Sequence, residues 1–336
     1  MKALVTGANG FLGRRIVRRL LDEGIAVRAL VRPGHADQCR GAELYEGDIC
    51  DDGAVAAAVA GVDWVIHAAA RVATSGSWES FAEPNIRGTR RVIRAARAAG
   101  VQRVVHLSSL SVYAVPYDGV TITEDSPYES EGDSRGHYSR SKLAADRLAL
   151  HEAARGAPVT VLRPGLLYGP GKRPPVARQS FGAGQFKWIL ATPRYTLPLT
   201  YVDNVADAAV LAASAEGAVG QAFTIVDANV PQAEYVALYR QISGERWRPV
   251  FLPVGTIARA AWVLERALRL ARRRSPVTYH QVRRATQRAL FDCSRAERVL
   301  GWRPAVGLRE GLQRSFDSLR EDPPSAGATA LASVTS

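Results

Sequence analysis

The sequence predicts an α/β fold: a doubly wound parallel sheet with a smaller, discontinuous C-terminal lobe. In the first half of the chain, short apolar runs alternate with longer stretches of helical periodicity, as in parallel strands joined by crossover helices. The apolar runs show little internal alternation, which is typical of strands covered on both faces. After Pro164 the regular alternation gives way to segments rich in glycine and proline. This change indicates where the second lobe begins.

Strands and helices follow one another in a regular order. Predicted strands cover residues 2–6, 26–31, 64–67, 103–107, 159–163 and 222–226. Predicted helices cover residues 11–23, 54–60, 85–99, 138–154 and 201–213. Because parallel strands need long crossover connections, a helix between successive strands is the expected arrangement.

Composition and cysteine usage narrow the class of protein. The chain has 336 residues, of which 47% are hydrophobic and 23% charged, enough to bury a substantial core. The first strand begins at Lys2 and leaves no room for a secretory leader, so we expect a cytoplasmic protein. Cys39, Cys50 and Cys293 are odd in number and have no CxxC spacing. We expect packing cysteines in a reducing compartment, and no metal site.

The net charge of +12 comes mainly from arginine, which supplies 40 of the 44 basic residues. These arginines are spread over several predicted helices, and the spread favours solubility rather than a dedicated charged site. The chain carries no helix-turn-helix, zinc-finger or RNP-type motif. Nucleic acid is therefore not an expected partner.

One local cluster, residues 257–274, is amphipathic. Five apolar residues recur there at helical spacing: Ile257, Ala261, Leu264, Leu268 and Ala271. Six arginines lie among and after them in the sequence. Such a helix can make a peripheral contact with an anionic membrane. It can instead cover a pocket, with arginine stems packed on apolar neighbours and the guanidinium groups in water. The second interpretation is favoured, and the first stays open.

A glycine-rich loop, TGANGFLG at residues 6–13, joins the first strand to the first helix. In this position glycines permit a tight turn and let backbone amides approach a pyrophosphate at the helix N-terminus. The loop predicts a Rossmann-type dinucleotide site made by Gly7, Asn9, Gly10, Phe11, Leu12 and Gly13. Asp48 is predicted to accept a hydrogen bond from the adenine amino group, with Ile49 beside it in the same site.

The second predicted strand carries no acidic residue at its end to hold a ribose 2′-hydroxyl. It carries Arg28 and, after Ala-Leu-Val, Arg32. A guanidinium at Arg32 suits a 2′-phosphate through charge-assisted hydrogen bonds. The sequence therefore predicts NADP(H) as the preferred cofactor and leaves NAD(H) open.

The loop and the change after Pro164 set the domain boundaries. We assign residues 1–163 and 201–228 to the dinucleotide-binding domain, and residues 164–200 and 229–320 to a substrate-binding lobe. The tail 322–336 is small and polar and is expected to be disordered. Phe186, Trp188 and Ile189 either line an apolar pocket for a small-molecule substrate or belong to the core.

Three groups can act on one carbonyl carbon. Tyr138 and Lys142 are spaced i, i+4 and share a helix face. Hydride transfer to or from a carbinol carbon needs a group that moves the hydroxyl proton, and a phenol has an ordinary pKa of about 10. A nearby ammonium is expected to lower that pKa, which makes Tyr138 a candidate general acid/base. Ser109, or less favourably Ser108, is expected to hydrogen-bond the substrate oxygen.

With these residues the chain resembles the extended short-chain dehydrogenase/reductase superfamily, also called the NAD-dependent epimerase/dehydratase family. The matching motifs are TGANGFLG at 6–13, GDICD at 47–51, HAAA at 67–70, NIRGT at 85–89, LSSLSVY at 107–113, YSRSK at 138–142, RPGLLYGPG at 163–171 and YVDNVADA at 201–208. The segments 78–81 and 199–203 look more like the 3β-hydroxysteroid dehydrogenase-like and ketone reductase branch. A glycine at 165, where nucleotide-sugar epimerases often carry an asparagine, points the same way.

The resemblance implies roles for particular residues. It implies that Ser109, Tyr138 and Lys142 are the catalytic residues. Lys142 is also expected to hydrogen-bond the hydroxyls of the nicotinamide ribose. It makes Asn85 the residue that steadies the active-site helix. It adds Ala68, Ala69, Ala70, Asn85 and Pro164 to the cofactor site. It also implies a homodimer built through the helices that begin near Asn85 and Tyr138.

Three functions follow as expectations. The first is an NADP(H)-dependent oxidoreductase that interconverts a secondary alcohol and a ketone on a mainly apolar small molecule. The second is a nucleotide-sugar epimerase or dehydratase that retains NAD. The third is a protein that binds a dinucleotide without chemistry. Because Ser, Tyr and Lys are all present, the first two are preferred to the third.

Overall fold

The computed structural model describes residues 1–34, 39–73, 75–115, 119–130, 136–176, 180–182, 185–189, 191–252, 254–270 and 288–321. The predicted disordered tail, 322–336, lies outside the described residues, as do residues 271–274 of the amphipathic cluster.

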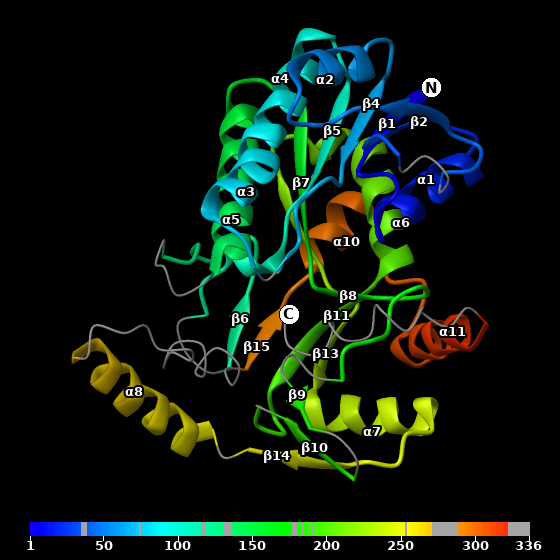
Figure 1. Ribbon diagram of the computed structural model, residues 1–336. Coiled ribbons are helices and arrows are strands. Elements are labelled where there is room, and N and C mark those ends of the chain that lie inside the picture. The colour runs from blue at the N-terminus through cyan, green and yellow to red at the C-terminus, as the bar shows by residue number, and fades with distance from the viewer. Residues whose placement is uncertain are drawn as a thin grey trace.

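A seven-stranded parallel sheet forms the centre of the molecule (Figure 1). Its strands are β1 (Lys2–Thr6), β2 (Ala26–Val31), β3 (Glu43–Glu46), β4 (Trp64–His67), β5 (Arg103–Leu107), β7 (Val159–Pro164) and β12 (Ala222–Ile225). They lie in the order β12-β7-β5-β4-β1-β2-β3. The order reverses between β1 and β4, and ligands of doubly wound folds bind beyond the carboxyl ends of the strands at such a point. The fold class predicted from the sequence is confirmed.

Helices cover both faces of this sheet and make two apolar cores. They are α1 (Gly13–Asp22), α2 (Asp52–Val59), α3 (Trp78–Ala82), α4 (Thr89–Ala98), α5 (Gly136–Ala154), α6 (Val202–Ser214) and α10 (Ser294–Leu300). Side chains of α1, α6 and α10 pack on one face. Side chains of α2, α4 and α5 pack on the other. Apart from the edge strand β3, the strands are therefore largely buried on both sides, which explains why their sequences hardly alternate.

The helix predicted at 85–99 differs from the structure. The chain is already helical from Trp78, and a π-helix, η2 (Glu83–Gly88), separates α3 from α4. Pro84, which suggests a helix start in sequence, lies at the beginning of this wider π-helical segment. Single-turn π segments are rare and often occur at functional sites. Asn85 lies in this one, and its side chain is buried.

Three smaller sheets accompany the large one, and two of them lie wholly in the second lobe. One holds β8 (Leu166–Tyr168), β11 (Thr196–Tyr201) and β13 (Ala228–Pro231), and another holds β9 (Ser180–Phe181), β10 (Phe186–Ile189) and β14 (Arg248–Phe251). The third pairs β6 (Val120–Ile122) with β15 (Ala289–Phe291). The remaining helices are α7 (Gln232–Ser243), α8 (Val254–Leu270), α11 (Leu308–Glu321) and the short η3 (Leu110–Val112) and η5 (Glu216–Ala218).

The second lobe has a core of its own, rich in tyrosine. Tyr168, Tyr201, Tyr235 and Tyr239 are buried there together with aliphatic side chains of β11, α7 and α11. The segment 294–302 differs from the sequence-based assignment, because Ala296, Leu300 and Trp302 pack into the core of the large sheet. Figure 1 shows α10 beside α6, where it packs against β12, the edge strand of the large sheet. Its amphipathic pattern alone did not indicate which sheet it covers.

A buried ion pair lies beneath the strand ends. Arg163, on β7, is 1% exposed and Asp146, on α5, is 0% exposed. The guanidinium donates to both carboxylate oxygens, at 3.0 and 2.8 Å. It also donates to the hydroxyl oxygens of Tyr113 at 2.7 Å and Tyr128 at 2.6 Å. The pair is therefore hydrogen-bonded on both sides.

Replacement of Asp146 by Asn is expected to destabilise the protein by about 3–5 kcal/mol, because it leaves the Arg163 guanidinium buried without its counter-charge. Urea denaturation of both proteins measures the difference. The double variant Asp146→Leu, Arg163→Met removes both charges and should recover much of the loss. An Asp146→Asn protein as stable as the wild type would show that the pair does not hold α5 to the sheet.

Candidate active site

The glycine loop lies where β1 ends and α1 begins. A Cβ at Gly7, whose φ is +66°, would approach the Ala69 Cα to 2.8 Å, and a Cβ at Gly13 would approach the Gly7 carbonyl oxygen to 2.0 Å. No side chain caps the start of α1, and its first turn has no acidic residue. The positive end of the helix therefore meets an exposed loop at Gly10. This geometry fits a dinucleotide pyrophosphate.

A chain of buried hydrogen bonds starts beside this loop. The Ala69 N–H donates to the Thr6 Oγ1 at 3.3 Å, and Thr6 Oγ1 lies 2.7 Å from Nδ1 of His67. His67 Nε2 lies 3.0 Å from the Thr89 Oγ1, and the Thr89 hydroxyl donates to the Asn85 carbonyl at 2.7 Å. Since the Thr89 proton is committed to Asn85, the imidazole must carry its proton on Nε2 and accept from Thr6 on Nδ1.

Asn85 connects this series of hydrogen bonds to α5, the helix that carries Tyr138. Its Oδ1 accepts from the Arg71 N–H at 2.7 Å, and its Nδ2 donates to the Arg71 carbonyl at 3.2 Å and to Ser141 Oγ at 2.8 Å. The Ser141 hydroxyl in turn donates to the Tyr138 carbonyl at 2.7 Å. Asn85 therefore fixes the position of the segment after β4 relative to the first turns of α5.

Ser109, Tyr138 and Lys142 meet at the carboxyl edge of the sheet. Ser109 follows β5 and caps η3, where its Oγ accepts from the Ser111 N–H at 3.1 Å. Tyr138 is half-buried in the first turn of α5. One turn further, the Lys142 ammonium is buried and donates to the Leu107 carbonyl at 2.5 Å. The i, i+4 spacing thus places both side chains beside the end of β5.

The protonation of these groups differs from the sequence expectation. Burial raises the pKa of Tyr138 above its ordinary value, and a hydrogen bond with Ser109 opposes the rise. Burial lowers the pKa of Lys142 to about 8, although Asp146 favours the charged ammonium. The lowered phenol pKa expected from the sequence is not found here, where burial of Tyr138 has the larger effect. Tyr138 is consequently held in its protonated form.

Asp146 supports the site from below. It lies one turn after Lys142 on α5, and its carboxylate accepts from the Ser108 hydroxyl at 2.6 Å. Ser108 is therefore committed to a buried network, whereas Ser109 is half-buried. This distinction supports the preference for Ser109 over Ser108.

The other predicted cofactor residues surround the loop. Ala68, Ala69 and Ala70 follow β4 and are half-buried, and Pro164 is buried at the end of β7. The Asp48 carboxylate is exposed and accepts from the Cys50 N–H at 2.9 Å, with Ile49 buried between them.

The two arginines of the second strand have different surroundings. Arg32 is exposed directly after β2, on the side where the glycine loop lies. Arg28 lies near the start of β2, pairs with Glu43 and donates to the carbonyls of Ala58 and Ala60 at 2.9 and 2.8 Å. Arg28 is thus occupied at the amino half of the strand, whereas Arg32 lies at the end of the strand nearer the glycine loop.

The second lobe returns to the glycine loop just after β8. Arg15, in α1, donates to the Pro170 carbonyl at 3.2 Å and pairs with Asp203 at 3.5 Å. The Lys172 ammonium lies 5.8 Å from the centre of the Phe11 ring. The segment 168–172 is therefore held over the first helix turn. Ile189 is buried in the second core, whereas Phe186 and Trp188 are exposed, so these three residues do not line one common pocket.

Aromatic and basic side chains border Tyr138. The Arg140 guanidinium lies 4.3 Å from the centre of the Trp78 ring, and the His137 ring lies 5.9 Å from Trp78 and 6.0 Å from Phe81. These stacking contacts connect α3 with the beginning of α5.

Several residues of this arrangement were missed in the sequence analysis. His67, Thr89 and Ser141 form the hydrogen-bond chain, and Asp146 lies under Lys142. His67 stands in the HAAA motif and Asp146 stands four residues after Lys142, so position relative to a motif could have indicated both. Their partners come from distant segments and have no local signal.

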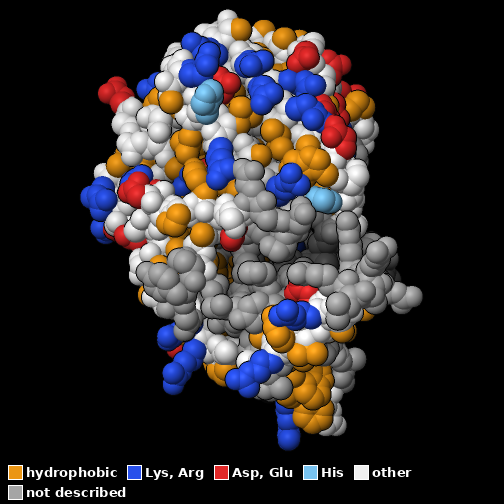
Figure 2. All heavy atoms as spheres, turned by 90° about the vertical axis from the view of Figure 1, so that its left-hand side faces the viewer, with side chains coloured by type: hydrophobic (Ala, Val, Ile, Leu, Met, Phe, Trp, Pro, Cys, Tyr) orange, Lys and Arg blue, Asp and Glu red, His pale blue; other side chains and the backbone are white. Residues whose placement is uncertain are grey.

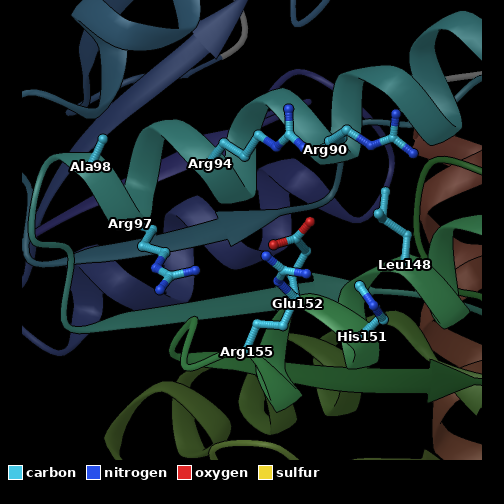
Figure 3. A pocket seen from close by; sticks show the side chains of 8 residues that line it. All are labelled: Arg90, Arg94, Arg97, Ala98, Leu148, His151, Glu152 and Arg155. Atoms are coloured by element: carbon cyan, nitrogen blue, oxygen red, sulfur yellow. The ribbon is translucent and has the colours of Figure 1, made fainter.

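A groove of about 650 Å³ lies between α4 and α5, away from Tyr138. It is lined by Arg90, Arg94, Arg97, Ala98, Leu148, His151, Glu152 and Arg155. Figure 3 shows Arg97 pointing from α4 toward α5, and the Glu152 carboxylate pointing from α5 toward α4. The groove is too basic for an apolar substrate. The homodimer through these helices stays a prediction, and it would bring like charges together.

Comparison with known proteins identifies the family. The profile of the NAD-dependent epimerase/dehydratase family matches residues 3–225. The chain belongs to this family. It is an enzyme of the extended short-chain dehydrogenase/reductase type, and its central sheet is the Rossmann-like sheet of that superfamily.

Individual relatives cover nearly the whole chain. A 2-alkyl-3-oxoalkanoate reductase of Stenotrophomonas maltophilia is 33% identical over 326 residues, which are 94% of this chain and 98% of the relative. A decarboxylating sterol-4-alpha-carboxylate 3-dehydrogenase of Mus musculus is 28% identical over 344 residues, 96% of this chain and 92% of the relative. The crystal structure of gox2253 superposes with a TM-score of 0.81 at 27% identity, covering 95% of this chain and 98% of that one.

The described residues offer neither a membrane-spanning helix nor a cluster of metal ligands. Within the described ranges, no helix combines the length and apolarity that a membrane span requires. The same ranges contain no group of three or more His, Cys, Asp or Glu side chains that could hold a metal ion.

The state of His67 makes stability depend on pH. Burial lowers the pKa of His67 to about 3, so the folded protein keeps the imidazole neutral while the unfolded chain takes up a proton below about pH 6.5. A group with a lowered folded pKa contributes stability above its unfolded pKa and loses it as pH falls toward the folded value. As the pH falls from about 6.5 to 3, His67 should therefore lower the free energy of unfolding by up to about 1.4 kcal/mol per pH unit.

Comparison with the variant His67→Gln isolates this contribution. Urea denaturation at several pH values should give a shallower loss of stability on acidification in the variant. Other buried groups titrate in both proteins, among them Asp227, whose pKa burial raises to about 7, and their contributions cancel in the difference. Parallel pH profiles for the two proteins would contradict the assignment of a neutral imidazole.

Proposed function

We propose that this enzyme is an NADP(H)-dependent oxidoreductase that interconverts a secondary alcohol and a ketone on a mainly apolar small molecule. The observation that carries the proposal is the meeting of Ser109, Tyr138 and Lys142 at the carboxyl end of β5. The names of two relatives, a 3-oxoalkanoate reductase and a sterol 3-dehydrogenase, support an apolar hydroxy or keto substrate. The substrate is therefore proposed as a 3β-hydroxysteroid-like alcohol or a β-keto compound.

Each residue has a proposed role. A nicotinamide dinucleotide bound at the glycine loop supplies or takes up the hydride. Tyr138 holds a proton under the raised pKa and donates it to the carbonyl oxygen when the ketone is reduced. Ser109 donates a hydrogen bond to the same oxygen as negative charge develops there. Lys142, fixed by Leu107, places its ammonium where it can bind the ribose hydroxyls and favour the phenolate once the proton has left.

Replacement of Tyr138 by Phe should reduce turnover on the order of 10² to 10⁴-fold, because it removes the proton donor and keeps the ring. The assay is sustained NADPH oxidation with a panel of apolar ketones and β-keto acids. Cofactor affinity, measured separately by fluorescence titration, should change little. Phe at this position with undiminished turnover would remove Tyr138 from the mechanism.

The same assay separates the reductase from its main alternative. A nucleotide-sugar epimerase returns its cofactor unchanged in each cycle, so it consumes no NADPH. Wild-type protein that leaves NADPH unchanged with every ketone, and epimerises a nucleotide sugar, would replace the proposal.

Selectivity for NADP(H) is proposed to rest on Arg32. Removal of a charge-assisted contact costs about 1.5–3 kcal/mol, so Arg32→Ala should weaken NADP(H) binding roughly ten- to hundredfold and leave NAD(H) binding unchanged. Dissociation constants of both cofactors measure the effect. Arg18→Ala, which removes an outward-facing arginine of α1, serves as the control. Equal affinity of the wild type for the two cofactors would overturn the assignment.

A further inference from the structure

Three consecutive residues of helix α8 carry large apolar side chains that are exposed. Trp262 is 47% exposed, Val263 59% and Leu264 43%. Soluble proteins scatter single exposed apolar residues over their surfaces, whereas a contiguous group marks a site of interaction. Figure 2, viewed from the side where α8 lies in Figure 1, shows apolar side chains gathered at the lower end of the molecule beside basic ones.

The helix is separated from the cores of both lobes. Within the described residues, the buried side chains of α8 are Ala258 and Ala261, with Ile257 packed against them, and they form a cluster distinct from the large ones. Figure 1 shows α8 beyond β14, projecting to the side of the body. The described part of the helix therefore does not join the core of the second lobe, and its expected role in covering a pocket stays a prediction.

The charge of this segment has one dominant sign. Residues 254–274 contain six arginines and a single acidic residue, Glu265, which gives a net charge of +5. Arg259 and Arg266 are exposed on α8, and the Arg266 guanidinium lies 4.8 Å from the centre of the Trp262 ring. Arg272, Arg273 and Arg274 follow in the sequence, outside the described residues.

We propose that α8 docks onto an anionic phospholipid surface. A lipid interface matches both properties of the helix, since aliphatic side chains enter the acyl boundary, tryptophan lies at the headgroup level and arginines meet phosphates. A protein partner would have to offer an apolar surface with several carboxylates at matching positions. A bilayer offers apolar depth and negative charge everywhere along the helix. Each basic residue near such a surface strengthens the binding.

Docking would bring the second lobe to the bilayer, where an apolar substrate concentrates. This purpose rests on the proposed function, whereas the binding itself does not. A failure of vesicle binding would leave NADPH oxidation of soluble ketones intact, and a failure of ketone reduction would leave vesicle binding intact. The two outcomes can therefore be told apart.

The test is co-sedimentation of the full chain with vesicles. Vesicles of equal parts phosphatidylglycerol and phosphatidylcholine should bind the protein, and vesicles of phosphatidylcholine alone should bind it at least about tenfold more weakly. The double variant Arg259→Glu/Arg266→Glu should reduce binding to mixed vesicles at least about tenfold. The triple variant Trp262→Ser/Val263→Ser/Leu264→Ser should reduce it by at least as much. Unchanged urea unfolding midpoints would show that both variants are folded.

A matched control distinguishes docking from general attraction of a basic protein. The double variant Arg246→Glu/Arg298→Glu makes the same change of charge at two exposed arginines outside α8. It should alter binding to mixed vesicles less than about twofold. Loss of binding in this control equal to that in the α8 variants would overturn the proposal. Absence of binding by the wild type would overturn it as well and turn attention to a protein partner.

Insertion of Trp262 supplies an independent readout. Brominated acyl chains in the mixed vesicles should quench part of the tryptophan fluorescence of the wild type. That quenching should largely disappear in Trp262→Phe, which keeps the ring apolar. Equal quenching in both proteins would show that another tryptophan contacts the lipid and that α8 does not dock.

Discussion

The candidate site depends on one buried chain of hydrogen bonds from β1 to α5. Thr6, His67, Thr89 and Asn85 are linked in series, and Asn85 continues through Ser141 to the Tyr138 backbone. Every donor and acceptor along it has a partner, which is the condition under which a buried polar network gives rigidity rather than a penalty. The end of the cofactor strand and the first turn of α5 therefore form a single unit. Without it, the position of the phenol relative to the glycine loop would rest on apolar packing and on the contacts of Lys142 and Asp146 with β5 and β7.

A second layer of polar groups sets the electrostatics of the site. Asp146 accepts from Ser108 and Tyr128 and is paired with Arg163, so its charge is largely balanced before it acts on Lys142. This explains why burial determines the direction in which the pKa of Lys142 moves. The same low-dielectric surroundings raise the pKa of Tyr138. Burial thus favours the neutral form of both groups.

The sequence predicted the parts of this protein that local patterns encode. The six strands, the glycine loop and the i, i+4 pair on α5 each have a signature within a few residues, and the structure contains all of them. The strand β3 is short and mostly exposed, so its composition resembles a loop. The π-helix could not be predicted, because it depends on Asn85 reaching Arg71 and Ser141, which lie 14 and 56 residues away. The partners of His67 and Asp146 were missed for the same reason.

The protonation of Tyr138 bears on the direction of the proposed reaction. A phenol whose pKa is raised keeps its proton until a nearby charge changes, so in this state it is suited to donate rather than to accept. Positive charge that develops beside it would favour the phenolate, and the buried Lys142 ammonium would then gain a partner within the same pocket. Release of the proton is thus coupled to the appearance of positive charge, which is what hydride loss from a reduced nicotinamide produces. Tyr138 is therefore proposed to donate the proton when a ketone is reduced and, as the phenolate, to accept it when an alcohol is oxidised.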